Sequence, residues 1–163
     1  MVGNGMEKAM SSSTLNEHYR ALETMYLSAP LNRFYEPTIC VEHQASEISI
    51  KVEEKFFHAG GAMHGSIYFK MLDDAAFFAA NSVESTFFVL TADFRIDLLR
   101  PCTGGLITSK GTIVRAGRQD ILAESKLFDE QDRLLATGIG RFSRGRNQLM
   151  SLECYATVFT QKK

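Results

Sequence analysis

The chain has 163 residues, of which 45% are hydrophobic, and a single domain of this length can bury about two thirds of the surface of its unfolded chain. The formal net charge is −1, and basic and acidic residues are mixed along the sequence, which excludes the basic surface of a typical nucleic-acid-binding protein. No apolar run approaches the ~20 residues of a membrane span, and no signal-peptide core is present. We therefore expect a cytoplasmic protein with neither a nucleic-acid partner nor a membrane partner.

Residues 1–13 are polar and contain two glycines, so they are expected to form a mobile arm ahead of a single domain over 14–163. Thr14 and Glu17 form a capping-box pattern, and apolar residues then repeat at helical spacing as far as Pro30. This segment is predicted to be an amphipathic helix that packs on a sheet or on a partner subunit.

Strands are predicted where apolar residues alternate with polar ones between turn-forming residues. They cover residues 38–43, 47–52, 86–100, 106–115, 120–128 and 134–143. The last segment, 147–163, fits either a final strand or a short helix. One long helix among runs of strands is an α+β pattern, and we expect a mostly antiparallel sheet that wraps around that helix.

The helix is predicted within the stretch HAGGAMHGSIYFKMLDDAAFF, residues 58–78. The stretch begins as a loop of small residues with two histidines and continues into a helix that is apolar on almost every side, and such a helix is normally enclosed by the rest of the protein. Lys70, Asp73 and Asp74 interrupt its apolar pattern. Neighbouring helix positions point about 100° apart, so the two aspartates face different directions. Asp74 can pair with Lys70 at the surface.

Asp73 shares its helix face with Phe69 and Phe77, so we expect it to be the buried aspartate. A buried carboxylate is costly unless it is paired, which makes Asp73 a functional candidate, although a structural ion pair fits equally well. The loop favours a functional role. The first N–H groups of a helix have no internal partner and point towards an anion or a polarised oxygen, and Gly65 has no side chain to obstruct that approach.

Four stretches, HAGGAMHGS, MLDDAA, VLTADF and LLRPCTGG, resemble the hotdog-fold acyl-CoA thioesterases, in particular the phenylacetyl-CoA thioesterase-like group, over about residues 38–145. In that group a loop with an Asn and an HGG motif leads into a long helix with an Asp, then a strand with a Ser or Thr and a turn containing RP. The resemblance places HGG on His64, Gly65 and Ser66, the helix Asp on Asp73, and the Ser or Thr on Thr91.

Two positions depart from the family pattern. Ser66 stands at the second glycine of HGG, and His58 stands where the family has its Asn. A histidine can donate a hydrogen bond as an amide does, but only in one tautomer, and it adds a group that titrates near neutral pH.

The resemblance implies a hotdog fold, in which a long central helix is wrapped by a curved antiparallel sheet, here with an extra N-terminal helix. It also implies a homodimer whose sheets pair edge to edge, or a homotetramer of two such dimers. The active site then lies between subunits, where the loop of one chain faces the Asp-bearing helix of the other. A long apolar edge strand fits this arrangement, because it would otherwise invite aggregation.

The implied reaction is hydrolysis of an acyl-CoA thioester, which needs an activated water or an attacking carboxylate and a donor for the developing oxyanion. Asp73 would be the general base or the nucleophile, and the N–H of Gly65 would hold the oxyanion. His58 would polarise the carbonyl or orient the water. Thr91 would hydrogen-bond the water or Asp73, and His64 would hold the loop in place.

Substrate contacts are expected from two groups of residues. Candidates for the acyl or aryl pocket are Met63, Phe69, Phe77 and Phe78, although aromatic residues at helical spacing more often belong to a core. Ser66 is a further candidate for contact with the substrate. Candidates for the phosphates of coenzyme A are Arg100, Arg118 and Arg144. Coenzyme A enters only as part of the substrate, and no cofactor is expected.

No metal is expected either. The three cysteines, Cys40, Cys102 and Cys154, stand apart without CxxC spacing, which favours reduced thiols. The set His58, His64 and Asp73 lacks the spacing and the fourth ligand of a zinc site.

Two other functions remain compatible with the sequence. A hotdog hydratase or dehydratase would use His58 and Asp73 to move protons without releasing the thiol. A non-catalytic acyl-CoA-binding protein would keep the fold, with His58 and Ser66 marking lost activity.

Overall fold

The structure is a computed structural model that describes residues 12–160. The predicted arm, residues 1–13, lies outside the described residues except for Ser12 and Ser13, which begin the first helix. The elements in chain order are α1 (Ser12–Ser28), α2 (Asn32–Tyr35), β1 (Thr38–Glu42), β2 (Ala45–Lys51), the 3₁₀ turn η1 (Glu54–Phe56), α3 (Gly65–Asn81), β3 (Phe87–Leu98), β4 (Leu106–Ala116), β5 (Asp120–Asp129), β6 (Leu134–Gln148), the 3₁₀ turn η2 (Leu149–Ser151) and α4 (Glu153–Thr160).

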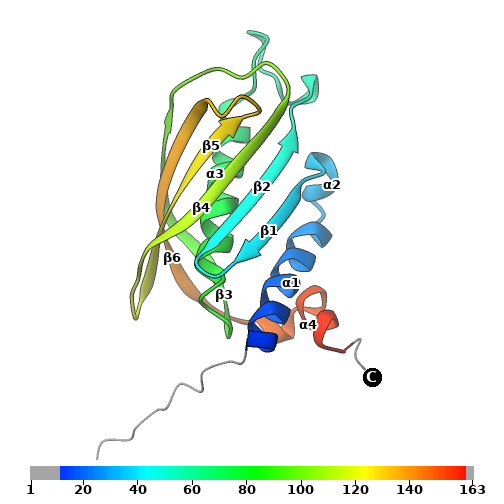
Figure 1. Ribbon diagram of the computed structural model, residues 1–163, viewed down its shortest axis with the longest axis vertical. Helices are drawn as coiled ribbons and strands as arrows, with labels where there is room; N and C mark the ends of the chain where they lie inside the picture. Colours follow the sequence, from blue (N-terminus) through cyan, green and yellow to red (C-terminus); the bar gives the residue numbers. More distant parts are fainter. Residues whose placement is uncertain (1–11, 161–163) are drawn as a thin grey trace, which may run out of the picture.

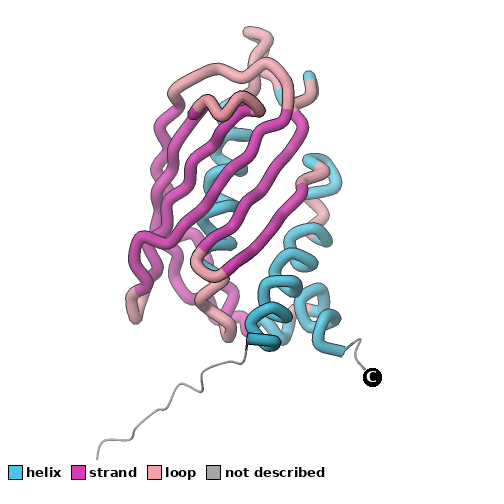
Figure 2. Tube along the Cα trace, in the orientation of Figure 1, coloured by secondary structure: helices cyan, strands magenta, loops and turns pink. Residues whose placement is uncertain are grey.

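The six strands form one antiparallel sheet in the order β1-β2-β4-β5-β6-β3. The sheet curves around α3, which lies along its inner face (Figure 1). Figure 2 shows the helices gathered on the inner side and at one end of the sheet. The predicted α+β class and the wrapped helix are thus confirmed, and the C-terminal segment forms the helix α4.

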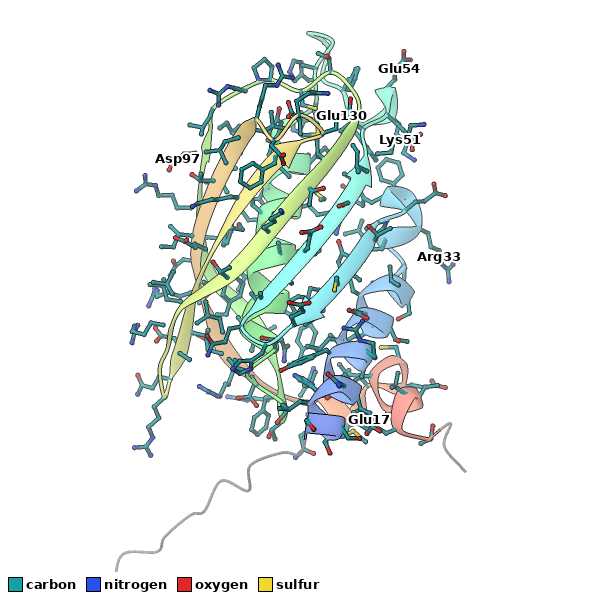
Figure 3. All side chains as sticks on the ribbon, viewed as in Figure 1. Glu17, Arg33, Lys51, Glu54, Asp97 and Glu130 are labelled. Atoms are coloured by element: carbon teal, nitrogen blue, oxygen red, sulfur yellow. The ribbon has the colours of Figure 1, made fainter. Side chains whose placement is uncertain are left out.

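Alternation explains why the strands cover the helix. In β5 every second residue is buried, among them Ile121, Ala123 and Leu127, and the residues between them are more exposed. The labelled charged side chains of Arg33 and Asp97 point away from the body of the domain (Figure 3).

The backbone of β4 lies close against α3 at Gly111. A Cβ atom there would lie 2.1 Å from the carbonyl oxygen of Ala75, so only glycine fits without displacing the helix. Ser46 of β2 donates its hydroxyl to the same carbonyl over 2.6 Å. The sheet is therefore fixed against the helical turn that carries the two aspartates.

Helices α1 and α4 pack against each other at the end of the domain beside β1 (Figure 1). His18 of α1 is fully buried between them. Its Nε2 donates to the carbonyl oxygen of Asn81 over 2.9 Å, and its Nδ1 accepts from the Tyr155 hydroxyl over 2.7 Å. Desolvation lowers the pKa of His18, so a neutral imidazole joins α1 to α4 and to the end of α3.

The three cysteines are free thiols. Within residues 12–160, no helix is long and apolar enough to span a membrane.

Candidate active site

Asp73 lies in the middle of α3 and faces the edge strand β3. The Thr91 hydroxyl of β3 donates to Asp73 Oδ1 over 3.0 Å. The prediction of a buried Asp73 needs correction, because the residue is only half-buried and Phe69 on the same face is 40% exposed. The physical reason is that this face of α3 points to the edge of the sheet, where no further strand of the same chain covers it.

The surroundings of Asp73 favour a proton-accepting carboxylate. Desolvation raises the pKa of Asp73 to about 6, the hydrogen bond from Thr91 opposes this effect, the charge of Asp74 adds to it, and Lys70 opposes it. A group with such a pKa is mostly ionised at pH 7 and close to the value at which a general base works best.

Asp74 pairs with Lys70, as predicted, but not at the open surface. The two side chains are 21% and 12% exposed, because Tyr26 of α1 lies against them and donates its hydroxyl to Asp74 Oδ2 over 2.8 Å. The pair therefore belongs to the wall of the site.

A cleft of about 350 Å³ opens beside Asp73 between α1, α3 and β3. Its lining consists of Met25, Tyr26, Ala29, Leu31, Asn32, Lys70, Asp73, Asp74, Phe77, Phe78, Phe88, Leu90 and Thr91. Phe77 is in aromatic contact with Phe78 and Phe88, at ring-centroid distances of 5.1 and 5.2 Å. The cleft is thus mostly apolar, with two carboxylates of which only Asp74 is paired with a lysine, as a pocket for an acyl or aryl group would be.

Two of the predicted pocket residues lie elsewhere. Phe69 packs edge-on against Phe94, with ring centroids 5.7 Å apart, and Met63 is buried behind the loop. The contribution of α1 was missed, because the amphipathic pattern of α1 indicates only that the helix packs on something. The adjacent Met25 and Tyr26 near its C-terminal end are the one signal in the sequence that could have suggested a contribution of α1 to the pocket.

The loop before α3 begins its helix through His64. This residue is the N-cap, and its Nδ1 accepts from the backbone N–H of Ser66 over 3.1 Å and lies 2.8 Å from the Ser66 hydroxyl. His64 therefore holds the start of the helix, and Ser66 is part of the same capping arrangement.

His58 and Gly65 lie at this end of α3. The N–H of Gly60 donates to His58 Nδ1 over 2.9 Å, which places the proton on Nε2 and keeps that atom as a donor. A side chain at position 60 would come within 2.8 Å of the imidazole. Among the described residues the N–H of Gly65 has no hydrogen-bond partner, so it can receive a ligand oxygen.

These loop residues share a second cleft of about 340 Å³, lined by His58, Ala62, Met63, Gly65, Tyr68, Leu98, Leu99, Arg100 and Pro101. Asp73 and Thr91 do not reach it. Gly65 and Asp73 are eight residues apart on one helix, which corresponds to about 12 Å along its axis. One chain therefore brings the candidate oxyanion donors, His58 and Gly65, together in one cleft, and Asp73 together with Thr91 in another.

The three arginines predicted to bind phosphate have different surroundings. Arg144 donates to Glu84 over 2.5 Å and to the carbonyl oxygen of Arg118 over 2.8 Å, so it ties β6 to neighbouring segments. Arg100 lines the loop cleft and donates to the carbonyl oxygen of Leu134 over 2.5 Å. The exposed Arg118 lies in the turn between β4 and β5.

Metal ligands do not gather at the site. Within the part of the chain that the structure describes, no group of three or more His, Cys, Asp or Glu side chains is arranged to hold a metal ion.

Comparisons with known proteins agree with this architecture. The family model described as "Thioesterase superfamily" matches residues 60–136, a segment that contains Gly65, Asp73 and Thr91. Two proteins of Saccharolobus solfataricus that are named as candidate esterases also match. The first is 29% identical over 63% of this chain and 73% of the relative. The second is 24% identical over 61% of this chain and 67% of the relative.

Solved structures show the same fold. The PaaI protein of E. coli, from the phenylacetic acid degradation operon, superposes with a TM-score of 0.75 at 18% identity, over 82% of this chain and 96% of that one. A Shewanella oneidensis protein related to the thioesterase superfamily superposes with a TM-score of 0.76 at 20% identity, over 83% and 100%. The family match and the esterase names support a hydrolase. The resemblance seen in the sequence is thus confirmed: the chain has the hotdog fold and is similar to proteins of the thioesterase superfamily, PaaI among them.

Proposed function

We propose that this protein hydrolyses acyl-CoA or aryl-acyl-CoA thioesters to the free acid and CoA, with Asp73 as the general base or the nucleophile. The observation that carries the proposal is the position of Asp73, half-buried beside an aromatic cleft and 3.0 Å from the Thr91 hydroxyl. A carboxylate with a pKa of about 6 can accept a proton at neutral pH and return it to a leaving group.

In the general-base route, Asp73 takes a proton from a water molecule held near Thr91 while the water oxygen attacks the thioester carbon. The tetrahedral oxyanion accepts hydrogen bonds from the N–H of Gly65 and from Nε2–H of His58, and the positive end of the α3 dipole adds to their attraction. The C–S bond then breaks, and the proton on Asp73 passes to the departing thiolate. In the nucleophilic route the carboxylate attacks the thioester carbon, the C–S bond breaks and the CoA thiolate leaves. Water then hydrolyses the mixed anhydride, which releases the acid, restores the Asp73 carboxylate and supplies the proton that converts the thiolate to the thiol.

Both routes need the loop and the carboxylate on one carbonyl, which a single chain keeps about 12 Å apart along α3. The protein therefore works as a homodimer or a homotetramer in which the loop of one subunit faces Asp73 of the other. The edge strand β3 supports this assembly, since Leu90 and Leu98 on it are 54% and 52% exposed and its outer edge has no neighbouring strand.

His58 is compatible with catalysis rather than with a non-catalytic binding protein. The hydrogen bond from Gly60 to Nδ1 leaves Nε2–H free to donate, so the imidazole can supply the donor that an amide supplies in the family.

The test is release of free thiol, followed with a thiol-reactive dye, across short-chain, long-chain and aryl acyl-CoAs. Asp73→Asn should lower turnover at least ~100-fold, the lower range for a positioned acid or base, and circular dichroism should show the folded domain. Near-normal turnover in the folded variant would remove Asp73 from the mechanism.

If the folded wild type releases no thiol from any member of the panel, the hydrolase proposal is rejected. Calorimetric titration with a non-hydrolysable acyl-CoA thioether then separates a protein that takes up the ligand, either the binding protein or the hydratase, from a protein of unrelated chemistry, which does not.

A further inference from the structure

A second carboxylate lies directly beside the proposed catalytic one. Asp74 follows Asp73 on α3 and lines the same cleft. It is held by two donors, the ammonium of Lys70 and the hydroxyl of Tyr26. Two ionised carboxylates next to each other repel, and the charge of Asp74 makes Asp73 harder to ionise.

Lys70 is the cation that offsets this repulsion. It is one turn before Asp74 on α3 and also lines the cleft. Its ammonium lies 5.1 Å from the ring centroid of Tyr26 and 4.9 Å from that of Tyr35, so the two aromatic faces hold the charge next to the aspartates.

The charged and titratable groups around Asp73 come from three elements. Among the cleft-lining residues these are Lys70 and Asp74 of α3 itself and Tyr26 of α1, whereas Thr91 of β3 is neutral. Tyr35 of α2 adds the ring on the other side of Lys70. Desolvation, followed by the charge of Asp74, raises the pKa of Tyr26 well above its usual range, so its hydroxyl stays a donor to Asp74.

We propose that Lys70 is a positioning residue for the reaction: by neutralising Asp74 it allows Asp73 to be ionised and reactive at neutral pH. This inference rests on the proposed function of Asp73. A structural ion pair at positions i and i+4 could lie on any exposed helix face. The pair of Lys70 and Asp74 is instead largely covered, and burial of such a pair costs free energy. It lies beside Asp73, the carboxylate of the cleft that has no cationic partner of its own among the described residues.

The effects of the two residues on Asp73 agree with the geometry. The charge of Asp74 raises the pKa of Asp73, and the charge of Lys70 lowers it. Without Lys70 the repulsion from Asp74 would remain, and Asp73 would hold its proton to higher pH.

The experiment follows the Asp73 carboxyl by NMR in the full chain labelled with ¹³C at aspartate. Lys70→Met should move the titration midpoint of Asp73 up by about one pH unit, the lower range for a nearby charge. Asp74→Asn should move it down, and the double variant should return towards the wild type. Lys70→Arg should keep the wild-type midpoint, because the charge is retained.

A matched control is Lys110→Met. Lys110 lies 3.6 Å from Glu47 on the face of the sheet turned away from α3, so its loss should leave the titration of Asp73 unchanged. The acid limb of kcat/KM should move with the NMR midpoint, which means about a tenfold lower value for Lys70→Met at a pH below both midpoints.

Equal Asp73 titrations in Lys70→Met and Lys110→Met would overturn the inference. If Lys70→Met does not fold, the titration midpoints of Asp73 in Asp74→Asn and in the double variant are compared, because neither variant leaves an unpaired Asp74. An unshifted midpoint of Asp73 in Asp74→Asn would likewise reject the role of Lys70. A shifted midpoint in a protein that releases no thiol would withdraw the proposed reaction and leave the effect of Lys70 on Asp73 intact.

Discussion

The hydroxyl of Thr91 donates a hydrogen bond to Asp73 Oδ1 over 3.0 Å and so joins the middle of β3 to the middle of α3. Because this bond favours the ionised carboxylate, it lowers the pKa of Asp73 against the larger, opposite effect of desolvation.

The rate should depend on this balance. The pKa of Asp73 is about 6, and only the ionised form can accept a proton or attack, so kcat/KM should fall as the pH falls through about 6. Thr91→Val removes the hydrogen bond and should shift the acid limb to higher pH, whereas Thr91→Ser should restore it. A pH–rate profile of the three proteins is the measurement, and identical acid limbs in all three would contradict it.

His58→Asn should retain activity within about tenfold, since an amide can both accept from the Gly60 N–H and donate to the substrate. His58→Ala has no donor and should lose about 10²-fold, the usual cost of one oxyanion donor. Steady-state kinetics on one acyl-CoA measures both. A folded but inactive His58→Asn variant would mean that the imidazole has a chemical role of its own.

Subunits with different defects should complement each other. Asp73→Asn and His58→Ala chains, each nearly inactive alone, should form mixed dimers with one intact site when they are co-refolded. Random pairing of equal amounts makes half of the dimers mixed, each with one of its two sites intact, so about a quarter of the wild-type activity is expected. Activity no higher than the sum of the two parents would place the whole site within one chain.

His18 should make the fold sensitive to acid. Its pKa is lowered by burial, so the folded state binds fewer protons than the unfolded state below the ordinary histidine pKa of about 6.5. The stability that depends on neutral His18 is therefore present above pH 6.5 and is lost as the pH falls, by as much as ~2 kcal/mol at pH 5.

Denaturant unfolding of the wild type and of His18→Gln at pH 7 and pH 5 measures this effect. Glutamine can still donate to the Asn81 carbonyl but does not titrate, so the difference in unfolding free energy between the two proteins should shrink on acidification. If the difference in unfolding free energy stayed the same at both pH values, unfolding would not be coupled to proton uptake by His18.

Much of the fold could be predicted because local pattern and final environment agree. The alternation of Ile48 and Ile50 in β2, and of Ile121 and Ala123 in β5, places the same residues against α3 that the structure buries. The end of β6 was less predictable. This strand continues to Gln148, five residues past the predicted end at Ser143. The polar residues after Arg144 remain in the strand because they pair, with a register shift, with the start of β3.

The site shows the same division. The spacing between Gly65, Asp73 and Thr91 indicated three candidate site residues, and in the structure the Thr91 hydroxyl donates a hydrogen bond to Asp73. The roles of all three stay predictions. The part played by Tyr26 could not be predicted, because it depends on how α1 docks, and docking is a tertiary property with no local pattern. The expected burial of Asp73 was likewise overestimated, because the helical pattern does not show which face points to the edge of the sheet.

The contact between Gly111 and the Ala75 carbonyl also limits how the proposed substrate specificity can change. With no side chain between β4 and α3 at that point, the sheet side of the helix has no room for gradual adjustment. The opposite wall includes Ala29 and Leu31, which follow α1, and Leu31 is 60% exposed, so a side chain there can be lengthened or shortened without moving Asp73. If the proposed function is correct, new acyl preferences should therefore arise by substitution in the segment after α1, while the β4 side stays constant.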